Sequence, residues 1–313
     1  MEALLDAVDS FLGHLAAVAW GSVALAVLCH LGKIVARTRA WRNVVAAAYP
    51  EEKVRWRAVA GAYAASIGVN AIIPARGGDV LGLVVLKRRI EGSRYPTLAA
   101  TAVVLLLFDF VVGSALLAWA LTQGVLPGLD VIPRLPSIDW LWLFQHPRAA
   151  AVVSGAVVAA AFVGGVWAAR HIEAFWNRVR EGFTILRSPR LYATAVAAWQ
   201  VIEWTLRLAT VYFFLRAFHI PATAENAVFV QVAQSLSAVL PLTPAGIGTE
   251  QALLAYVLSG EASTTALLSF SVGMRLVLVT VNVVVGFTAI ALMLRTLDWR
   301  SVVSREAPAT QQD

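Results

Sequence analysis

The sequence predicts an all-α polytopic membrane protein. Of its residues, 59% are hydrophobic and 14% are charged, whereas soluble domains average about 25% charged residues. Apolar runs such as residues 11–32 and 276–294 are long enough for a helix to cross a hydrocarbon core of about 30 Å, which takes roughly 20 residues. Lipid offers no hydrogen-bond partners, so only a helix satisfies the backbone of such runs. We expect about five full spans and two additional helical hairpins.

The first apolar run is expected to remain in the protein rather than act as a cleaved signal peptide. The preceding residues 1–10 are acidic, whereas a signal peptide begins with basic residues. The single cysteine, Cys29, lies inside this run, which excludes a disulfide framework and a cysteine metal site. The formal net charge of +6 is typical of membrane proteins with Lys and Arg on cytoplasmic loops, so it gives no reason to expect nucleic acid.

Basic residues indicate which loops face the cytoplasm. Those between residues 33 and 57 place the first loop inside and the N-terminus outside. If the segment 58–94 enters and leaves on one side, nearly all remaining Lys and Arg also face the cytoplasm, and only Arg134, Arg148 and Arg216 do not. If the segment 58–94 instead crossed the membrane once, Lys and Arg would be spread over both sides and the cytoplasmic excess would disappear. Charge therefore favours a hairpin over 58–94, either re-entrant or made of two short spans, and a cytoplasmic C-terminus.

A second hairpin is predicted over residues 229–258, and it would enter from the outside. Short apolar arms flank a Pro/Gly break there, as in the first hairpin. The two tips also match, with Pro-Ala, then glycines, then a carboxylate that begins the returning helix, where an acid is favourable. Residues 11–122 and 191–294 are therefore candidate inverted repeats, joined by a connecting span over 149–169.

The remaining segments lie outside the spans. Residues 33–57 and 170–190 mix Arg with apolar residues at helical spacing. They are expected either as amphipathic helices on the inner membrane surface or as ordinary flanks whose long side chains reach the headgroups. Residues 123–147 are expected as an external interfacial segment. The chain would form one transmembrane domain over residues 1–299, with a disordered cytoplasmic tail over 300–313.

Ionisable residues fall inside the predicted spans and hairpins, where each costs about 2.5–3.5 kcal/mol on insertion scales and usually lines a polar cavity. Glu203 and Arg207 are four residues apart on one helical face, so they would either pair with each other or contribute to such a cavity. Asp109 would either partner an arginine or serve a proton-linked site. The full set is Arg76, Asp79, Asp109, Glu203, Arg207, Glu250 and Arg275.

Arginines from the hairpins and the neighbouring spans are expected to converge on one cavity, each compensated by a carboxylate. Guanidinium groups bind phosphate oxygens in a bidentate manner, so this cavity suits the anionic or phosphate-bearing headgroup of a membrane lipid. Glycines at the tips would either let backbone amides approach a phosphate or allow close helix packing. The predicted substrate-binding residues are Asn70, Pro74, Arg76, Gly77, Gly78, Asp79, Glu203, Arg207, Pro244, Gly246, Gly248, Glu250 and Arg275.

No catalytic constellation is found in the sequence. The histidines are scattered without metal-ligand spacing, and no nucleotide-binding motif is present. The longest stretches outside the predicted spans have only about 25 residues, which is below the size of a domain. We therefore expect no metal, no cofactor and no enzymatic activity.

Two regions resemble a known family. The stretches "VNAIIPARGGDVLGLVVLKRR" and "SLSAVLPLTPAGIGTEQALL" are similar to the signature regions of the flippase-like membrane proteins related to the transmembrane region of lysylphosphatidylglycerol synthase. Ala245 stands where the family commonly has Gly. The resemblance covers residues 10–295. The residues that carry it are Asn70, Pro74, Gly78, Asp79 and the basic helix end Lys87-Arg88-Arg89, then Pro244, Gly246, Gly248 and Glu250.

This resemblance implies lipid translocation between the leaflets of the bacterial cytoplasmic membrane, with an anionic lipid or lipid-linked precursor as substrate. Full-length synthases carry a soluble aminoacyl-transferase domain after the membrane region. This sequence shows none before Asp313, so lipid aminoacylation by this polypeptide is not expected. The alternative is a non-transporting partner or regulator of a membrane glycosyltransferase or lipid-modifying enzyme, in which the hairpins are structural.

Overall fold

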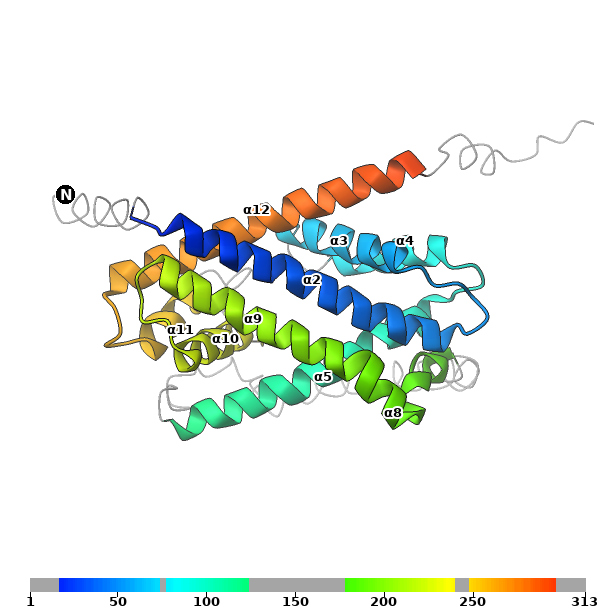
Figure 1. Cartoon of the computed structure of the whole chain (residues 1–313), viewed down its shortest axis with the longest axis horizontal. Helices are drawn as coiled ribbons and strands as arrows, with labels where there is room; N and C mark the ends of the chain where they lie inside the picture. Colours follow the sequence, from blue (N-terminus) through cyan, green and yellow to red (C-terminus); the bar gives the residue numbers. More distant parts are fainter. Residues whose placement is uncertain (1–16, 74–76, 124–177, 240–247, 297–313) are drawn as a thin grey trace, which may run out of the picture.

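The computed structural model is an elongated bundle of helices (Figure 1) and describes residues 17–73, 77–123, 178–239 and 248–296. Within these ranges the regular structure is helical, apart from one isolated bridge between Ser259 and Ala262. The helices are α2 (Trp20–Ala48), α3 (Trp56–Ile72), α4 (Gly77–Arg89), α5 (Tyr95–Thr122), η2 (Thr184–Arg187), α8 (Pro189–Tyr192), η3 (Ala193–Ala197), α9 (Ala198–Ala217), α10 (Ala224–Val239), α11 (Thr249–Val257) and α12 (Thr264–Thr296).

Three of these helices, α2, α5 and α12, are long and apolar enough to cross a membrane. They contain 29, 28 and 33 residues, which corresponds to about 43, 42 and 50 Å of helix. Their outward faces carry large apolar side chains such as Phe110 and Leu276, which are 73% and 66% exposed. An apolar outer surface of this kind suits lipid. The protein is therefore a multi-pass, all-helical membrane protein, as its composition predicts.

Helix α2 differs from the expectation at its C-terminal half. The sequence predicts a span over 11–32 and a surface segment from residue 33 onward, but α2 continues through Lys33 and Arg37 to Ala48. Gly32 lies inside this helix, where it gives room for Leu206 of α9, which would lie 3.1 Å from a Cβ. The charged residues that follow it stay in the helix because Arg37 pairs with Asp109 inside the bundle. Lys33 and Arg37 therefore belong to the bundle and not to a loop.

Several expected segments lie outside the described residues. They are residues 11–16 of the first run, most of the interfacial segment 123–147, the connecting span 149–169, residues 170–177 of the segment 170–190 and the tail 300–313. The rest of the segment 170–190 is described and includes η2 and the start of α8.

Two pairs of short helices occupy opposite ends of the bundle (Figure 1). Helices α3 and α4 pack against each other near the end where α2 finishes, and α10 and α11 lie near the end where α2 begins. The first pair contains 17 and 13 residues, the second 16 and 9. At 1.5 Å per residue each helix is shorter than the hydrocarbon core of about 30 Å.

Small residues bring the helices of the first pair together. A Cβ on Gly78 would lie 2.7 Å from Asn70 Oδ1 and closer still to the backbone oxygen of Ser66, and a Cβ on Gly82 would meet the Ser66 hydroxyl. Helix α3 crosses α12 in the same way, since a Cβ on Gly68 would lie 2.6 Å from Gly286 Cα. Stripes of small residues let helix backbones approach closely within a membrane.

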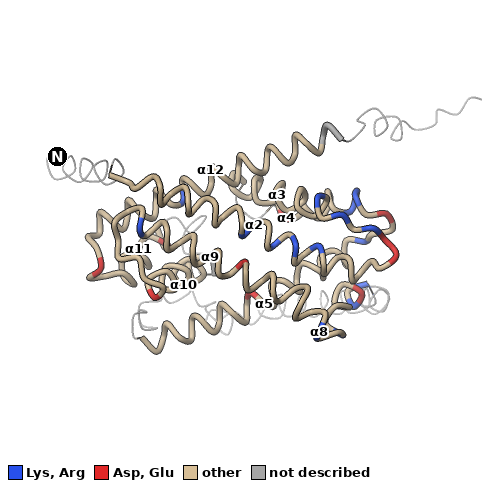
Figure 2. Tube along the Cα trace, viewed as in Figure 1, with Lys and Arg blue, Asp and Glu red and all other residues tan. Residues whose placement is uncertain are grey.

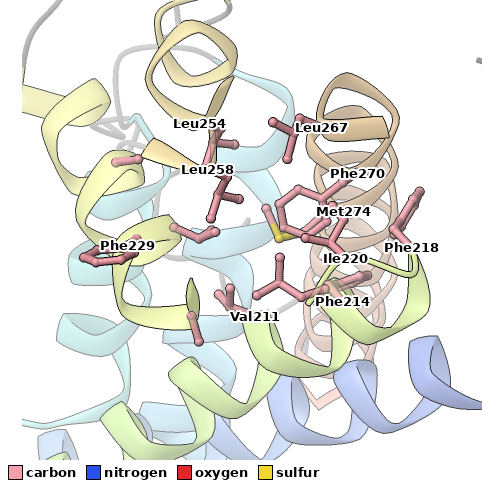
Figure 3. Close-up of a cluster of buried hydrophobic side chains, with 14 of the residues drawn as sticks. Val211, Phe214, Phe218, Ile220, Phe229, Leu254, Leu258, Leu267, Phe270 and Met274 are labelled. Carbon is pink, nitrogen blue, oxygen red and sulfur yellow. The ribbon is translucent and has the colours of Figure 1, made fainter. Parts of the chain in front are cut away.

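Apolar side chains form two separate cores. One core lies between α9, α10, α11 and α12 and includes Phe214, Phe270 and Met274, all nearly fully buried; Figure 3 shows these side chains pointing toward one another. The other core lies at the opposite end, between α2, α3, α4 and α5, and includes Val44 and Leu98. Side chains between the two cores can therefore be polar without disturbing either.

Basic residues are unevenly distributed along the bundle. Figure 2 shows Lys and Arg gathered at the end where α2 and α4 finish, with few at the opposite end. Lys87, Arg88 and Arg89 form the last turn of α4, where cations also interact favourably with the helix dipole.

Candidate functional site

A layer of charged side chains separates the two apolar cores. On α2, Ala26 belongs to one core and Ala40 to the other, and Lys33 and Arg37 lie between them. Helices α5 and α9 also contribute residues to both cores, and the residues between those contributions include Asp109 on α5 and Glu203 and Arg207 on α9. We call this set the charged layer; its members are Lys33, Arg37, Asp109, Glu203 and Arg207. Because α2 and α5 are long enough to span a membrane, a layer near their middle lies far from the bulk water at either surface.

Asp109 of α5 joins three helices. It accepts a hydrogen bond of 2.6 Å from Arg37 Nη1 of α2. Its other oxygen accepts from Trp204 Nε1 of α9 at 3.0 Å and from Gln200 Nε2 at 3.5 Å. Asp109 is therefore an arginine partner, one of the two roles that the sequence left open for it. Its partner is Arg37, which was expected in a loop.

Glu203 and Arg207 of α9 form the local ion pair that their spacing allows. Arg207 donates from Nη2 and Nε to Glu203 Oε1 at 2.6 and 3.2 Å. The guanidinium also lies over the ring of Trp204, 4.5 Å from its centroid, which adds a cation–π attraction. Glu203 is almost fully buried, but the Arg207 side chain is 26% exposed, so the arginine edge remains accessible.

Two adjoining cavities open beside the charged layer. The first has a volume of ≈ 230 Å³ and is lined by polar residues from three helices, including His30, Lys33, Arg207 and Gln234. The second has a volume of ≈ 200 Å³. The two cavities share Gln234, Met274 and Leu278 as lining residues. Among apolar side chains, the two cavities are lined by the cations Lys33, Arg207 and Arg275 and by the amides of Gln231, Gln234 and Asn282. Charged groups of this kind are costly at membrane depth and usually line polar cavities.

The second cavity contains another ion pair. Glu250, in the first turn of α11, accepts from Arg275 Nη1 of α12 at 3.4 Å and from Gln234 Nε2 of α10 at 3.1 Å. Glu250, Arg275 and Gln234 all line the cavity. The predicted cavity residues Arg207 and Arg275 therefore line two neighbouring cavities rather than one. Each has a carboxylate partner from the predicted set, Glu203 and Glu250 respectively.

A hydrogen bond between α2 and α12 lies where the cavities meet. His30 Nε2 lies 2.8 Å from Asn282 Oδ1. His30 lines the first cavity and Asn282 the second. Asn282 also lies one turn before Gly286, the residue at which α12 crosses α3. The contact thus links the cavity wall to the first hairpin.

Amide side chains close both hairpin tips. At the first tip, Asn70 accepts the backbone N–H of Gly78 at 2.8 Å and donates to Asp79 at 2.8 Å. At the second, Gln251 accepts the backbone N–H of Gly248 at 2.6 Å. Gly248 has φ +92°, a left-handed conformation that favours glycine. These two N–H groups already have protein partners, and Gly78 is also needed for close packing.

The predicted binding residues thus fall into separate groups. Among the described residues, Glu203, Arg207, Glu250 and Arg275 gather at or beside the two cavities. In contrast, the predicted tip residues that the structure describes do not line either cavity: Asn70, Gly77, Gly78, Asp79 and Gly248. Pro74, Arg76, Pro244 and Gly246 lie outside the described residues.

Sequence reasoning missed several polar residues of the cavities: His30, Lys33, Gln231, Gln234 and Asn282. A signal existed for some of them, because amides inside apolar runs are costly unless they bind something. "QVAQ" places two glutamines three residues apart, and Asn282 interrupts an otherwise apolar helix. Among the described residues, no group of three or more His, Cys, Asp or Glu is placed to hold a metal ion.

Comparison with known proteins assigns the chain to a family. Residues 4–286 match the family described as the lysylphosphatidylglycerol synthase TM region. The chain belongs to this family. Neither the curated proteins nor the solved structures contain a match. Membership in the lysylphosphatidylglycerol synthase TM family confirms the resemblance carried by the two hairpin motifs, and it indicates a membrane domain related to lipid modification or transport.

Proposed function

We propose that this protein translocates an anionic lipid, or a lipid-linked precursor, between the leaflets of the bacterial cytoplasmic membrane. The observation that carries the proposal is the pair of adjoining cavities beside the charged layer, whose lining includes Lys33, Arg207 and Arg275. A lipid headgroup crossing the bilayer needs a hydrated, charged route through the hydrocarbon core. Guanidinium and ammonium groups attract the phosphate that most anionic headgroups carry.

The proposal includes a topology of about five full spans with two hairpins of opposite orientation, either re-entrant or made of short spans. The short helix pairs α3–α4 and α10–α11 at opposite ends of the bundle support it. The basic end of the bundle, where α4 finishes, would face the cytoplasm. The N-terminus would then lie outside and the C-terminus inside, with residues 11–122 and 191–294 as inverted repeats.

A translocation assay tests this function. Proteoliposomes with a trace of anionic lipid, labelled on its headgroup with a fluorophore, are exposed to an impermeant reductant that bleaches only the outer leaflet. We expect the protein to bring the inner-leaflet label to the outside, so that bleaching goes to completion. Bleaching that stops at the outer leaflet, as in protein-free liposomes, would exclude translocation and favour a non-transporting partner of a membrane enzyme.

A matched pair of variants shows whether the cavity is the route. Arg207 lines the first cavity, whereas Arg216 lies two turns later on α9 and is exposed. We expect Arg207→Gln to slow bleaching of the inner-leaflet label by about tenfold or more, the scale of one charge-assisted hydrogen bond. Arg216→Gln should leave the rate unchanged. Equal rates in both variants, each folded as judged by thermal unfolding, would place the route elsewhere.

A further inference from the structure

The charged layer carries one more positive than negative side chain. Lys33, Arg37 and Arg207 are cationic, and Asp109 and Glu203 are anionic, which leaves one positive charge. Each arginine has its own carboxylate at 2.6 Å. The excess therefore resides on Lys33.

Lys33 has no anionic partner in the described part of the chain. It forms no salt bridge there, and no side-chain hydrogen bond. Its electrostatic neighbours include Arg207, which repels it, and Glu203, which attracts it but accepts two hydrogen bonds from Arg207 on Oε1. An unpaired ammonium group at membrane depth is costly, and this cost falls when an anion binds to it.

The surroundings of Lys33 form a binding site rather than a packing defect. Lys33 lines the first cavity together with the amides of Gln231 and Gln234, which can donate to or accept from a polar ligand. Arg207, which Glu203 and Trp204 hold in place, lines the same cavity. A positioned guanidinium and an unpaired ammonium on one cavity wall provide convergent donors for an oxyanion.

We infer that Lys33 is the residue on which a phosphate group docks in the first cavity, with Arg207 as the preorganised second donor. The inference deepens the proposed function, because it names the group of the substrate that the cavity recognises. The volume of ≈ 230 Å³ is below the 300–1,000 Å³ that is typical of sites for drug-sized ligands. It therefore suits a phosphate with its immediate substituents, while acyl chains would remain outside.

Ligand-induced thermal stabilisation tests the site without transport. The protein, in zwitterionic detergent, is titrated separately with short-chain phosphatidylglycerol, short-chain phosphatidylcholine and inorganic phosphate, and its Tm is followed by tryptophan fluorescence. A ligand that binds only the folded state raises Tm as its concentration exceeds Kd. We expect phosphatidylglycerol to raise Tm more than phosphatidylcholine, whose own cation neutralises its phosphate. A rise with inorganic phosphate alone would identify the free anion as a sufficient occupant.

The decisive comparison is between Lys33→Gln and Lys53→Gln. Both remove one ammonium group, but Lys53 is exposed and lies outside the helices. We expect Lys33→Gln to weaken binding of the effective ligand by about tenfold or more, Lys53→Gln to leave it unchanged, and Lys33→Arg to retain most of it. Equal stabilisation of the wild type and Lys33→Gln, or no stabilisation of the wild type by any phosphate ligand, would overturn the inference.

A readout without ligand separates binding from structure. If Lys33 is an uncompensated charge, Lys33→Gln should unfold at the same Tm as the wild type, or at a higher one, when no anion is present. A marked fall in Tm would show that Lys33 is a structural partner, and would contradict the inference. If the wild type translocates lipid and Lys33→Gln binds the ligand as tightly as the wild type does, the inference fails but the proposed function stands. Binding through Lys33 without translocation would leave the site intact and remove the function.

Discussion

Single residues in the middle of the bundle connect helices that are far apart in the sequence. Arg37 and Asp109 join α2 to α5, with their side chains only 12% and 19% exposed. Removing one partner of a buried pair leaves the other charge without compensation and costs about 3–5 kcal/mol. We expect Arg37→Gln and Asp109→Asn each to lower the free energy of unfolding by this amount, measured by denaturant unfolding in detergent micelles.

The double variant distinguishes a direct pair from two independent effects. Since Arg37→Gln with Asp109→Asn leaves no unpaired charge, it should cost clearly less than the sum of the single variants. Simple additivity would show that these two residues do not stabilise each other.

The amide of Asn70 is expected to stabilise the first hairpin. Asn70→Ala removes the acceptor of the Gly78 N–H and the donor to Asp79, and we expect a loss of about 1 kcal/mol, measured by thermal unfolding. As a control, Gln123→Ala removes an exposed amide that bonds only to its neighbour Thr122 and should stay within about 0.5 kcal/mol of the wild type. Equal effects of the two substitutions would argue against a role for Asn70 at the tip.

The sequence predicts ion pairs between residues that are close along one helix, but it does not predict ion pairs between residues on different helices. The Glu203–Arg207 pair follows from a spacing of four residues on a helix, and the structure contains it. The partners Arg37 and Asp109 are 72 positions apart, and nothing in a single sequence connects them. The sequence predicts Lys33 in a loop, because basic residues usually mark loops in membrane proteins, whereas the structure places it inside α2.

Among the helices, the crossing of α3 and α12 should tolerate no added atom. Gly68→Ala places a Cβ only 2.6 Å from Gly286 Cα, and overpacking costs typically 1–3 kcal/mol. Gly113→Ala on α5 is the matched control, because a Cβ there has nothing within 4 Å; it should stabilise the helix by roughly 0.5–1 kcal/mol. Thermal unfolding of the two variants is expected to shift in opposite directions, and a shift in the same direction would contradict the close crossing.

The hydrophobicity of the sequence predicts which segments form long helices, but it does not predict where each helix ends. The apolar runs over residues 97–122 and 264–294 predict spans, and α5 and α12 lie there, at Tyr95–Thr122 and Thr264–Thr296. The end of α2 was misplaced by 16 residues, from residue 32 to Ala48. The reason is physical, since charges end a span only when they must reach water. Here Arg37 finds its partner inside the bundle.

For the whole molecule, the uneven distribution of charge predicts the orientation in the membrane. Glu52, near the basic end, and Glu261, near the opposite end, are both exposed. In a Cys29→Ser background, we expect Glu261→Cys to react with an impermeant maleimide in intact spheroplasts, and Glu52→Cys to react only after permeabilisation. The reverse pattern would invert the topology, and labelling of both positions from outside would contradict a span between them.

The central claim is that a lipid headgroup occupies the cavities inside the bundle. Its most direct test is photocrosslinking with an anionic phospholipid that carries the photoreactive group on its headgroup, followed by peptide mapping. The account predicts crosslinks to residues that line the cavities, such as Gln231, Gln234 and Asn282, and their loss in Lys33→Gln. Crosslinks confined to lipid-facing side chains such as Phe110 and Leu276 would contradict it.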